Sequence, residues 1–180
     1  MPLYKASASE LAALVAADTN TSGFIKDTEG WRILGASGVA VSHTGNTSET
    51  ALSTTAVAAG AMGPNGILRV RALFSYTNSA NNKNLRIRLG GVSGTEFANI
   101  TATTTVHHDI IRTIHNRNSA SSQVGILATS TNPLTASSGA LIAGTINTAN
   151  AQDLVISGQL ASSGETVTLE SYIVELKYGA

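Results

Sequence analysis

The sequence has no cysteine and few charged or aromatic residues, and each shortage removes a class of protein. Without cysteine, neither a disulfide nor a thiolate metal site can form. Charged residues make up only 12% of the 180 residues and the formal net charge is zero, so no overall field attracts nucleic acid or an acidic membrane. The longest apolar run, Leu11 to Ala17, is too short to span a bilayer, and no signal peptide is recognisable. We therefore expect a soluble protein without membrane insertion.

What the chain has instead is a series of short alternating segments, in a composition whose 42% apolar residues suffice for a core. From residue 47 onward these segments are separated by turn residues such as Gly63-Pro64-Asn65-Gly66, with no helical pattern between them. They predict strands at 50–58, 66–77, 84–90, 95–103, 108–117, 122–129, 140–147, 152–160 and 165–177. This rhythm predicts an all-β fold, an antiparallel jelly-roll-like β-sandwich of eight or nine strands, over residues 47–180.

The N-terminal part has a different pattern. Residues 7–17 predict a short helix, because Ser7 and Glu10 have the spacing of a capping box. Residues 23–35 predict a small hairpin around a turn at Asp27–Gly30. A unit of this size cannot be stable by core burial alone, so we expect residues 1–35 to be an anchoring segment that leans on a partner. Residues 36–46, rich in Gly and Ser, are expected to be a linker.

The segment 66–90 predicts a second hairpin, with matching apolar faces if the loop lies near Ser79–Asn81 and Phe74 lies opposite Leu85. Its other face then carries four arginines, with Arg71 near Arg88. Like charges across a ladder are destabilising. Compensation is therefore expected from a neighbouring subunit, an anionic ligand, or acidic residues of the same chain, namely Glu96, Asp109, Glu170 or Glu175.

Few residues suggest catalysis or metal binding. The histidine cluster His107, His108, Asp109 and His115 has the residue types of a metal site, but its spacing matches no ligand motif. Serines occur in turns without a nucleophile elbow, and the acidic residues do not select a catalytic pair. Six of the seven arginines lie between Arg69 and Arg117, yet no exposed aromatic residues are interleaved with them. We therefore expect no cofactor, no metal, and no nucleic-acid partner.

Residues 63–91, GPNGILRVRALFSYTNSANNKNLRIRLGG, resemble a segment that recurs in virion proteins of tailed bacteriophages. The resemblance rests on the Gly-Pro-Asn-Gly turn, the Leu-Arg-Val strand, the amide-rich loop and the closing Leu-Arg-Ile-Arg-Leu-Gly-Gly; the final strand, LESYIVELKYG, also fits. The segment covers under a fifth of the chain. It implies a jelly-roll domain of a tail fibre, head fibre or capsid decoration protein, commonly trimeric, whose small N-terminal element tethers the chain to the particle. It implies no enzyme activity.

The leading hypothesis is a non-enzymatic structural protein of a phage virion, assembled in the host cytoplasm. Its partners are expected to be other virion proteins and itself, as a homotrimer. Buried aromatic and arginine side chains dominate many protein interfaces. The anchoring contacts are accordingly expected from Phe24, Ile25, Trp31, Arg32, Ile33 and Leu34. The subunit interface is expected at Arg69, Arg71, Arg86 and Arg88.

Two other functions stay open. The chain would be a carbohydrate- or receptor-binding module of a tail fibre, bound to a host-surface glycan, if Tyr76, Tyr172 or Tyr178 offered an exposed stacking face. A cupin-like metal enzyme would have the same strand count. It would require His107 and His115 to converge inside the barrel.

Overall fold

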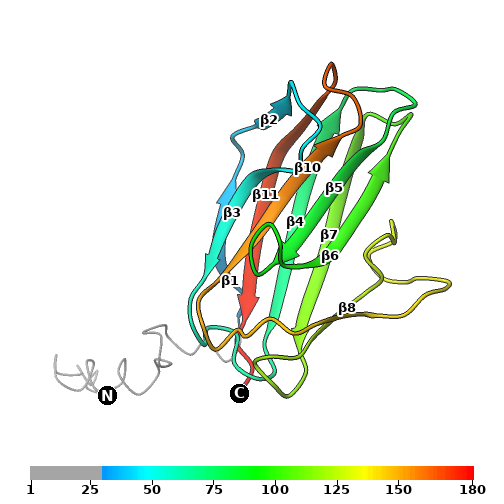
Figure 1. The fold of residues 1–180 in the computed structure, drawn as a ribbon. Helices are drawn as coiled ribbons and strands as arrows, with labels where there is room; N and C mark the ends of the chain where they lie inside the picture. The colour runs from blue at the N-terminus through cyan, green and yellow to red at the C-terminus, as the bar shows by residue number, and fades with distance from the viewer. Residues whose placement is uncertain (1–29) are drawn as a thin grey trace, which may run out of the picture.

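The computed structural model describes residues 30–180, which form two antiparallel sheets and contain no helix (Figure 1). The helix expected at 7–17 and the turn and first strand of the hairpin expected at 23–35 lie outside the described residues. The all-β antiparallel sandwich is confirmed, and the nine strands predicted after residue 47 each correspond to one of β3 to β11. The strands are β1 Arg32–Ser37, β2 Val41–Thr44, β3 Thr50–Val57, β4 Ile67–Tyr76, β5 Lys83–Leu89, β6 Thr95–Ala102, β7 His107–Asn116, β8 Gln123–Gly125, β9 Ile142–Gly144, β10 Gln152–Leu160 and β11 Thr166–Lys177.

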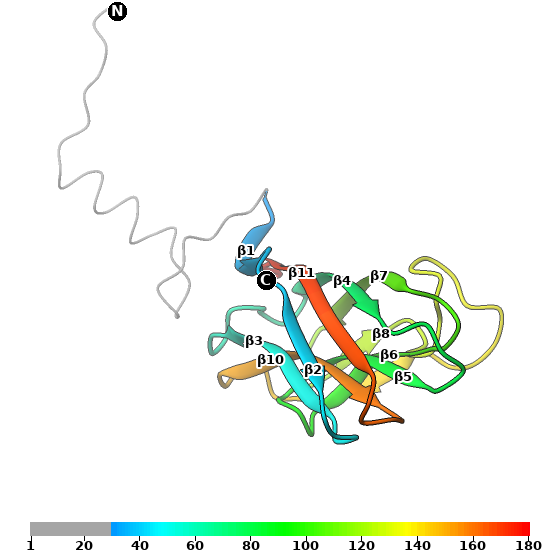
Figure 2. The same cartoon turned by 90° about the horizontal axis from the view of Figure 1, so that it is seen from above.

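Strand pairing is nested, as in a long ribbon folded back on itself. β5 pairs with β6, β4 with β7, β3 with β10, and β2 with β11, all antiparallel. Because β10 also pairs with β5 and β11 with β4, the pairs join into a small sheet, β3-β10-β5-β6, and a large sheet, β1-β11-β4-β7-β8-β9, with β2 beside β1 on β11. Figure 2 shows the two sheets as stacked layers. This wrapping of eight strands is the jelly roll.

The predicted hairpin between residues 66 and 90 is wrong. β4 pairs with β11 and β7, whereas β5 pairs with β10 and β6, so the two strands belong to different sheets. The alternation itself was correctly interpreted, since the inward residues of both strands, from Leu68 to Phe74 and from Leu85 to Leu89, belong to one buried core. The two apolar faces therefore contribute to the core from opposite layers instead of forming one ladder.

The amide-rich loop between β4 and β5 carries the chain from one sheet to the other. Glu165 holds it there, because its carboxylate accepts hydrogen bonds from Ser79 Oγ at 2.5 Å and from Asn81 Nδ2 at 2.8 Å. These two hydrogen bonds lower the pKa of Glu165 from its usual value, and the bond from Ser79 has the larger effect. Lys83, which is fully buried, donates to Ser79 Oγ at 2.9 Å and lies 3.8 Å from Glu165 Oε2. The loop is thus locked by long-range polar contacts and not by a tight turn.

The expected linker at 36–46 and the domain start at residue 47 also differ from the structure. The long strand β11 accommodates two further strands in succession, because Thr166–Leu169 pair with β2 and Tyr172–Leu176 pair with β1. Arg32 to Leu34, expected in the anchoring segment, therefore lie within the large sheet. The end of β1 and all of β2 are weakly apolar, and hydrogen bonding to β11 forms strands where the sequence predicted a linker.

The side of the sandwich where β6 ends the small sheet is closed by the connection between β8 and β9. Ala128 in this connection accepts a hydrogen bond from the amide of Asn99 in β6 at 2.9 Å. Arg112 reaches it from the inner face of β7 and donates to the carbonyls of Ile111 and Ser130. This guanidinium is buried, which lowers its pKa. Arg112 therefore contributes to the packing of this connection and is not exposed to solvent.

Candidate functional site

The outward face of the large sheet carries a grid of apolar and charged side chains. Alternation along β4 directs Arg69, Arg71 and Leu73 outward, because the residues between them are buried. Strand pairing extends these positions into three rows across the sheet, which are Ile33–Glu175–Arg69–Thr113, Ala36–Ile173–Arg71–Ile111 and Ser171–Leu73–Asp109. We call these rows, together with Trp31, the large-sheet surface.

Each arginine of this surface has one carboxylate partner. Arg69 Nε donates to Glu175 Oε2 at 2.8 Å, directly across the ladder, and this hydrogen bond raises the pKa of Arg69. Arg71 donates through Nε and Nη2 to Asp109, which lies one row away, and the pKa of Arg71 is raised for the same reason. Both carboxylates are among the four acidic residues expected to compensate the arginines. Because each guanidinium group is paired with one carboxylate, the net charge of the surface is close to zero.

Trp31 and exposed aliphatic side chains complete the surface. The guanidinium carbon of Arg69 lies 4.2 Å from the centroid of the Trp31 ring, a cation–π distance. Ile33 is 58% exposed and Leu73 is 39% exposed, both large apolar side chains without a covering element among residues 30–180. An indole stacked on an arginine beside exposed aliphatic groups has the composition of an interface hot spot.

The structure thus places some of the predicted anchoring residues beside some of the predicted subunit-interface arginines. Trp31 and Ile33, expected as anchoring residues, share one surface with Arg69 and Arg71, expected at a subunit interface. Leu34 packs against the core from the opposite face of β1. Phe24 and Ile25 lie outside the described residues.

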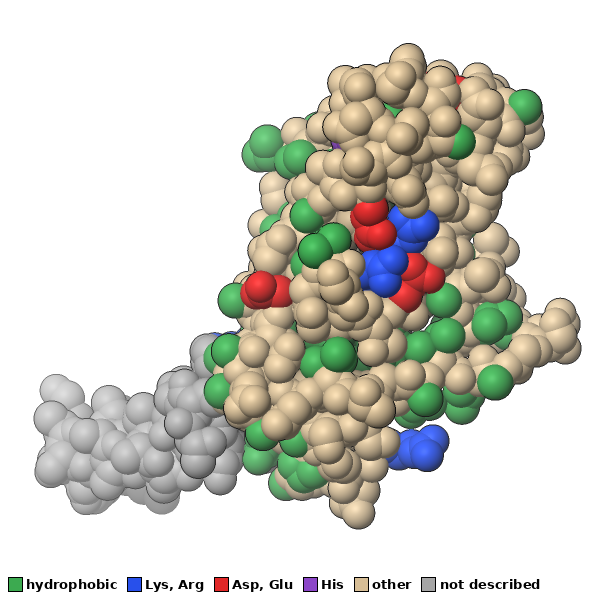
Figure 3. Space-filling view, in the orientation of Figure 1, with side chains coloured by type: hydrophobic (Ala, Val, Ile, Leu, Met, Phe, Trp, Pro, Cys, Tyr) green, Lys and Arg blue, Asp and Glu red, His purple; other side chains and the backbone are tan. Residues whose placement is uncertain are grey.

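Arg86 and Arg88 are not on this surface, because β5 lies in the small sheet. Their guanidinium groups are interlocked with two carboxylates: Arg88 Nε lies 2.9 Å from Glu49 Oε1 and its Nη2 lies 2.7 Å from Glu96 Oε2. Arg86 lies 3.2 Å from Glu49 and 3.0 Å from Glu96, the latter an ion pair without hydrogen-bond geometry. Figure 3 shows these charges gathered near the middle of an otherwise largely uncharged face. We call this group the small-sheet cluster.

Glu49 is the centre of the small-sheet cluster and was not foreseen from the sequence. Its Oε1 also accepts a hydrogen bond from the buried Ser157 at 2.6 Å. Partial burial raises its pKa, but the hydrogen bonds from Arg88 and Ser157 and the charges of both arginines outweigh burial, so the pKa of Glu49 is lowered. Glu49 lies in the connection before β3, where no alternating pattern marks it. Only the folded chain places it over β10 and β5.

The histidine cluster does not form a metal site. His107 and His115 lie on the single strand β7, eight residues apart, which separates them by roughly 26 Å at about 3.3 Å per residue. Asp109 is engaged by Arg71, and burial lowers the pKa of both His108 and His115. Within residues 30–180, no three His, Asp or Glu side chains are grouped so that they could hold a metal ion. A cupin-like centre built on His107 and His115 is therefore inconsistent with the fold.

The tyrosines considered for sugar stacking are not gathered into a platform. Tyr76 is buried, and its hydroxyl lies 2.7 Å from Thr105 Oγ1 and 3.1 Å from the carbonyl oxygen of His107. Tyr172 packs against the core, and Tyr178 is half-buried near the end of the chain.

No helix in the described part of the chain is long and apolar enough to cross a membrane.

Comparison with known proteins identifies no family. No protein-family model and no curated protein matches the chain. A solved structure of infectious bursal disease virus, Gt strain, is 14% identical at a TM-score of 0.36, over 86% of this chain and 34% of that chain. The structure of the Gx strain is 11% identical at a TM-score of 0.30, over 83% of this chain and 40% of that one. The chain thus spans well under half of either viral chain, and likeness at these TM-scores supports no conclusion about its function.

Proposed function

We propose that this chain is a non-enzymatic structural protein of a virus particle, displayed on the surface of a tailed bacteriophage. It would be a head decoration protein, a head fibre or a component of a tail fibre, assembled in the host cytoplasm. The observation that carries the proposal is the large-sheet surface, where Trp31, Arg69 and exposed aliphatic groups lie together on one sheet face. The resemblance of residues 63–91 to phage virion segments supports the same function.

The jelly roll also occurs in lectins and cupins, so the surface and not the fold favours a docking role. A sugar site needs an exposed aromatic platform, and Tyr76 is buried. A cupin centre needs converging histidines, and those of β7 are far apart. An exposed sheet face with paired charges and apolar groups is suited to contact with another protein surface.

The proposal is tested by adding full-length protein to phage particles assembled without it. We expect the wild type to bind, Trp31→Ala to bind at least about tenfold more weakly, and Leu141→Ala, an exposed apolar change on the β8–β9 connection, to bind normally. Failure of the wild type to bind any particle would refute the virion function. Normal binding by Trp31→Ala would refute the role of the large-sheet surface.

We further propose that copies meet in a homotrimer through the Ser171–Leu73–Asp109 row of this surface, which leaves Trp31 and Ile33 available to the particle. Light scattering of the full-length protein should then give about 55 kDa, three times the monomer mass of 18.4 kDa. Leu73→Glu places a further negative charge in this row, beside Asp109, and should shift the mass toward the monomer. A wild-type monomer, or a trimer unaffected by Leu73→Glu, would contradict this part of the proposal.

A further inference from the structure

The sandwich has an open seam where both sheets end. Among residues 30–180, the large sheet ends at β1 and the small sheet at β3. The two strands touch at Gly35, where a Cβ atom would lie 2.9 Å from Thr55 Oγ1, so that a larger residue would require Thr55 to shift. A bulge between Ile33 and Gly35 then turns the start of β1 away from β3. The seam is therefore closed at Gly35 and opens toward the first residues of β1.

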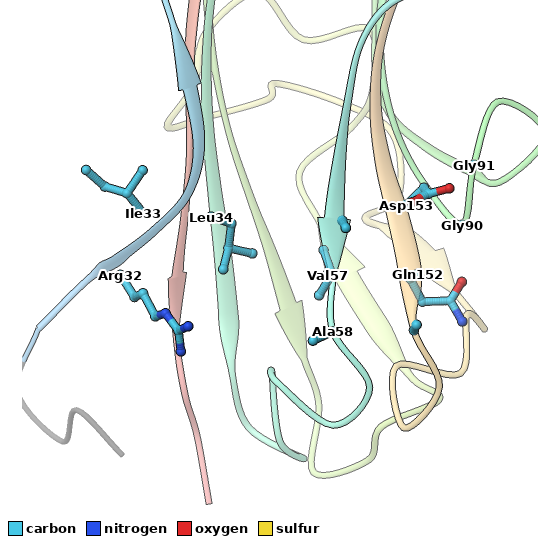
Figure 4. A pocket seen from close by; sticks show the side chains of 11 residues that line it. Arg32, Ile33, Leu34, Val57, Ala58, Gly90, Gly91, Gln152 and Asp153 are labelled. Carbon is cyan, nitrogen blue, oxygen red and sulfur yellow. The ribbon is translucent and has the colours of Figure 1, made fainter. Parts of the chain in front are cut away.

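The opening is a groove of about 520 Å³. Its floor is apolar, with Leu34 from β1 facing Val57 and Ala58 at the end of β3 (Figure 4). Arg32 stands on one side and Asp153, at the start of β10, on the other. The groove runs along the edge of β1 that faces away from β11. An added strand would find backbone groups along that edge and an apolar floor beneath it.

We propose that residues 23–26 of the same chain, Gly-Phe-Ile-Lys, dock in this groove as a strand added to β1. The chain before residue 30 is 29 residues long, and it joins the described domain at Gly30, directly before the residues that line the groove. Asp27 to Gly30 provide a four-residue turn, a length common in hairpins. No other part of the chain outside the described residues is so close along the sequence.

The register of such a hairpin determines which face of the sheet Phe24 and Ile25 would occupy. A four-residue turn sets Ile25 opposite Arg32 and Phe24 opposite Ile33. Because successive residues of a strand point to opposite faces, Ile25 then shares the groove side of β1 with Leu34. Phe24 shares the outward face with Ile33 and extends the large-sheet surface. The segment thus closes the seam and enlarges the apolar surface on which the proposed docking depends.

The absence of cysteine makes a direct test simple, since any disulfide formed must come from introduced residues. In the full-length chain, Ile25→Cys combined with Ala58→Cys should form an intrachain disulfide on mild oxidation, detected as a monomer with altered mobility. The matched control combines Ile25→Cys with Ala51→Cys, which is exposed on β3 about 23 Å along the strand and should not form one. Lack of a bond in the first pair, equal bonding in both pairs, or bonding only between two chains would overturn the proposal.

A second measurement does not depend on cysteine geometry. In full-length protein, Ile25→Asp should speed amide hydrogen exchange in residues 32–34 at least about tenfold, while exchange in β4 stays unchanged. Unchanged exchange in residues 32–34 would also refute docking of the segment. Neither experiment involves a particle, so failure here leaves the virion function to be judged by its own test.

Discussion

The two Leu-Arg-x-Arg segments are almost the same in sequence, yet their arginines occupy different environments. In the large sheet, the side chain of Arg71 is 60% exposed and has one carboxylate partner. In the small sheet, the side chain of Arg88 is 17% exposed and is held by Glu49, Glu96 and a backbone carbonyl. Similar strands therefore give an open surface in one layer and a closed cluster in the other.

The difference is one of desolvation. Exposed ion pairs contribute little to stability, because water and salt already stabilise both charges. Partly buried charges depend on their partners, because removing one leaves the other uncompensated in a poorly solvated place. The small-sheet cluster thus serves the fold, whereas the large-sheet surface is free to serve binding.

The largest effect is expected from Glu49→Gln. This change leaves Arg86 and Arg88 with one shared carboxylate and should lower the free energy of unfolding by about 2–3 kcal/mol. Urea denaturation measures it. The matched change in the large sheet, Glu175→Gln, should cost about 0–1 kcal/mol. Equal losses in the two variants would remove the distinction between the faces.

The next effect is the pH dependence that Glu49 confers. Its pKa is lowered in the folded protein, so its contribution to stability is fully present above the unfolded pKa of about 4.3 and is lost as the pH falls through the lower folded pKa. The stability difference between wild type and Glu49→Gln should therefore shrink as the pH falls from about 5 to below 4. Denaturation curves at several pH values measure this, and a difference that grows toward acid pH would show the sign to be wrong.

A smaller effect is expected from Trp31→Ala in the isolated protein. The stacking on Arg69 is half-exposed, so its loss should cost about 0.5–1 kcal/mol. Thermal unfolding, with the exposed loop change Val92→Ala as control, measures it. A loss as large as that of Glu49→Gln would mean that Trp31 is a core residue and not a surface one.

The smallest effect is expected from Arg71→Ala, whose side chain is mostly in solvent. Its loss should leave the unfolding free energy nearly unchanged, whereas Arg88→Ala, at the matching position of the other segment, should lower it clearly. Urea denaturation of the pair is the most direct comparison of the two faces. Similar values for the two arginines would contradict the role of desolvation.

Much of the fold was predictable because alternation is a local property. The strands from β3 to β11 follow from side chains two residues apart, and these determine which face is buried whatever the partner strand is. The pairing of β4 with β7 was not predictable in this way, since an apolar face packs equally well within a hairpin or across a sandwich. The start of β1 was expected as a hairpin strand, but its second half and β2 were missed because their few apolar residues leave them looking like a loop.

The compensating acidic residues were predictable only in part. Asp109, Glu175 and Glu96 were named from the need to neutralise four arginines, and each has an arginine partner. Glu170, also named, instead accepts a hydrogen bond from Ser75. The need for charge balance predicts that acidic residues pair with the arginines. Which acidic residue pairs with which arginine depends on strand register, and register is determined by contacts between residues distant in sequence.

By itself, the sequence determined that this chain is a β-sandwich without cysteine chemistry and, for β4 and β5, which residues face the core. Those properties depend on composition and on a two-residue period. Only the tertiary structure decided that one arginine pair is closed in by Glu49 and the other lies open beside Trp31. The physical reason is that burial, and with it the strength of each charge interaction, depends on which segments the nested ribbon lays over each face.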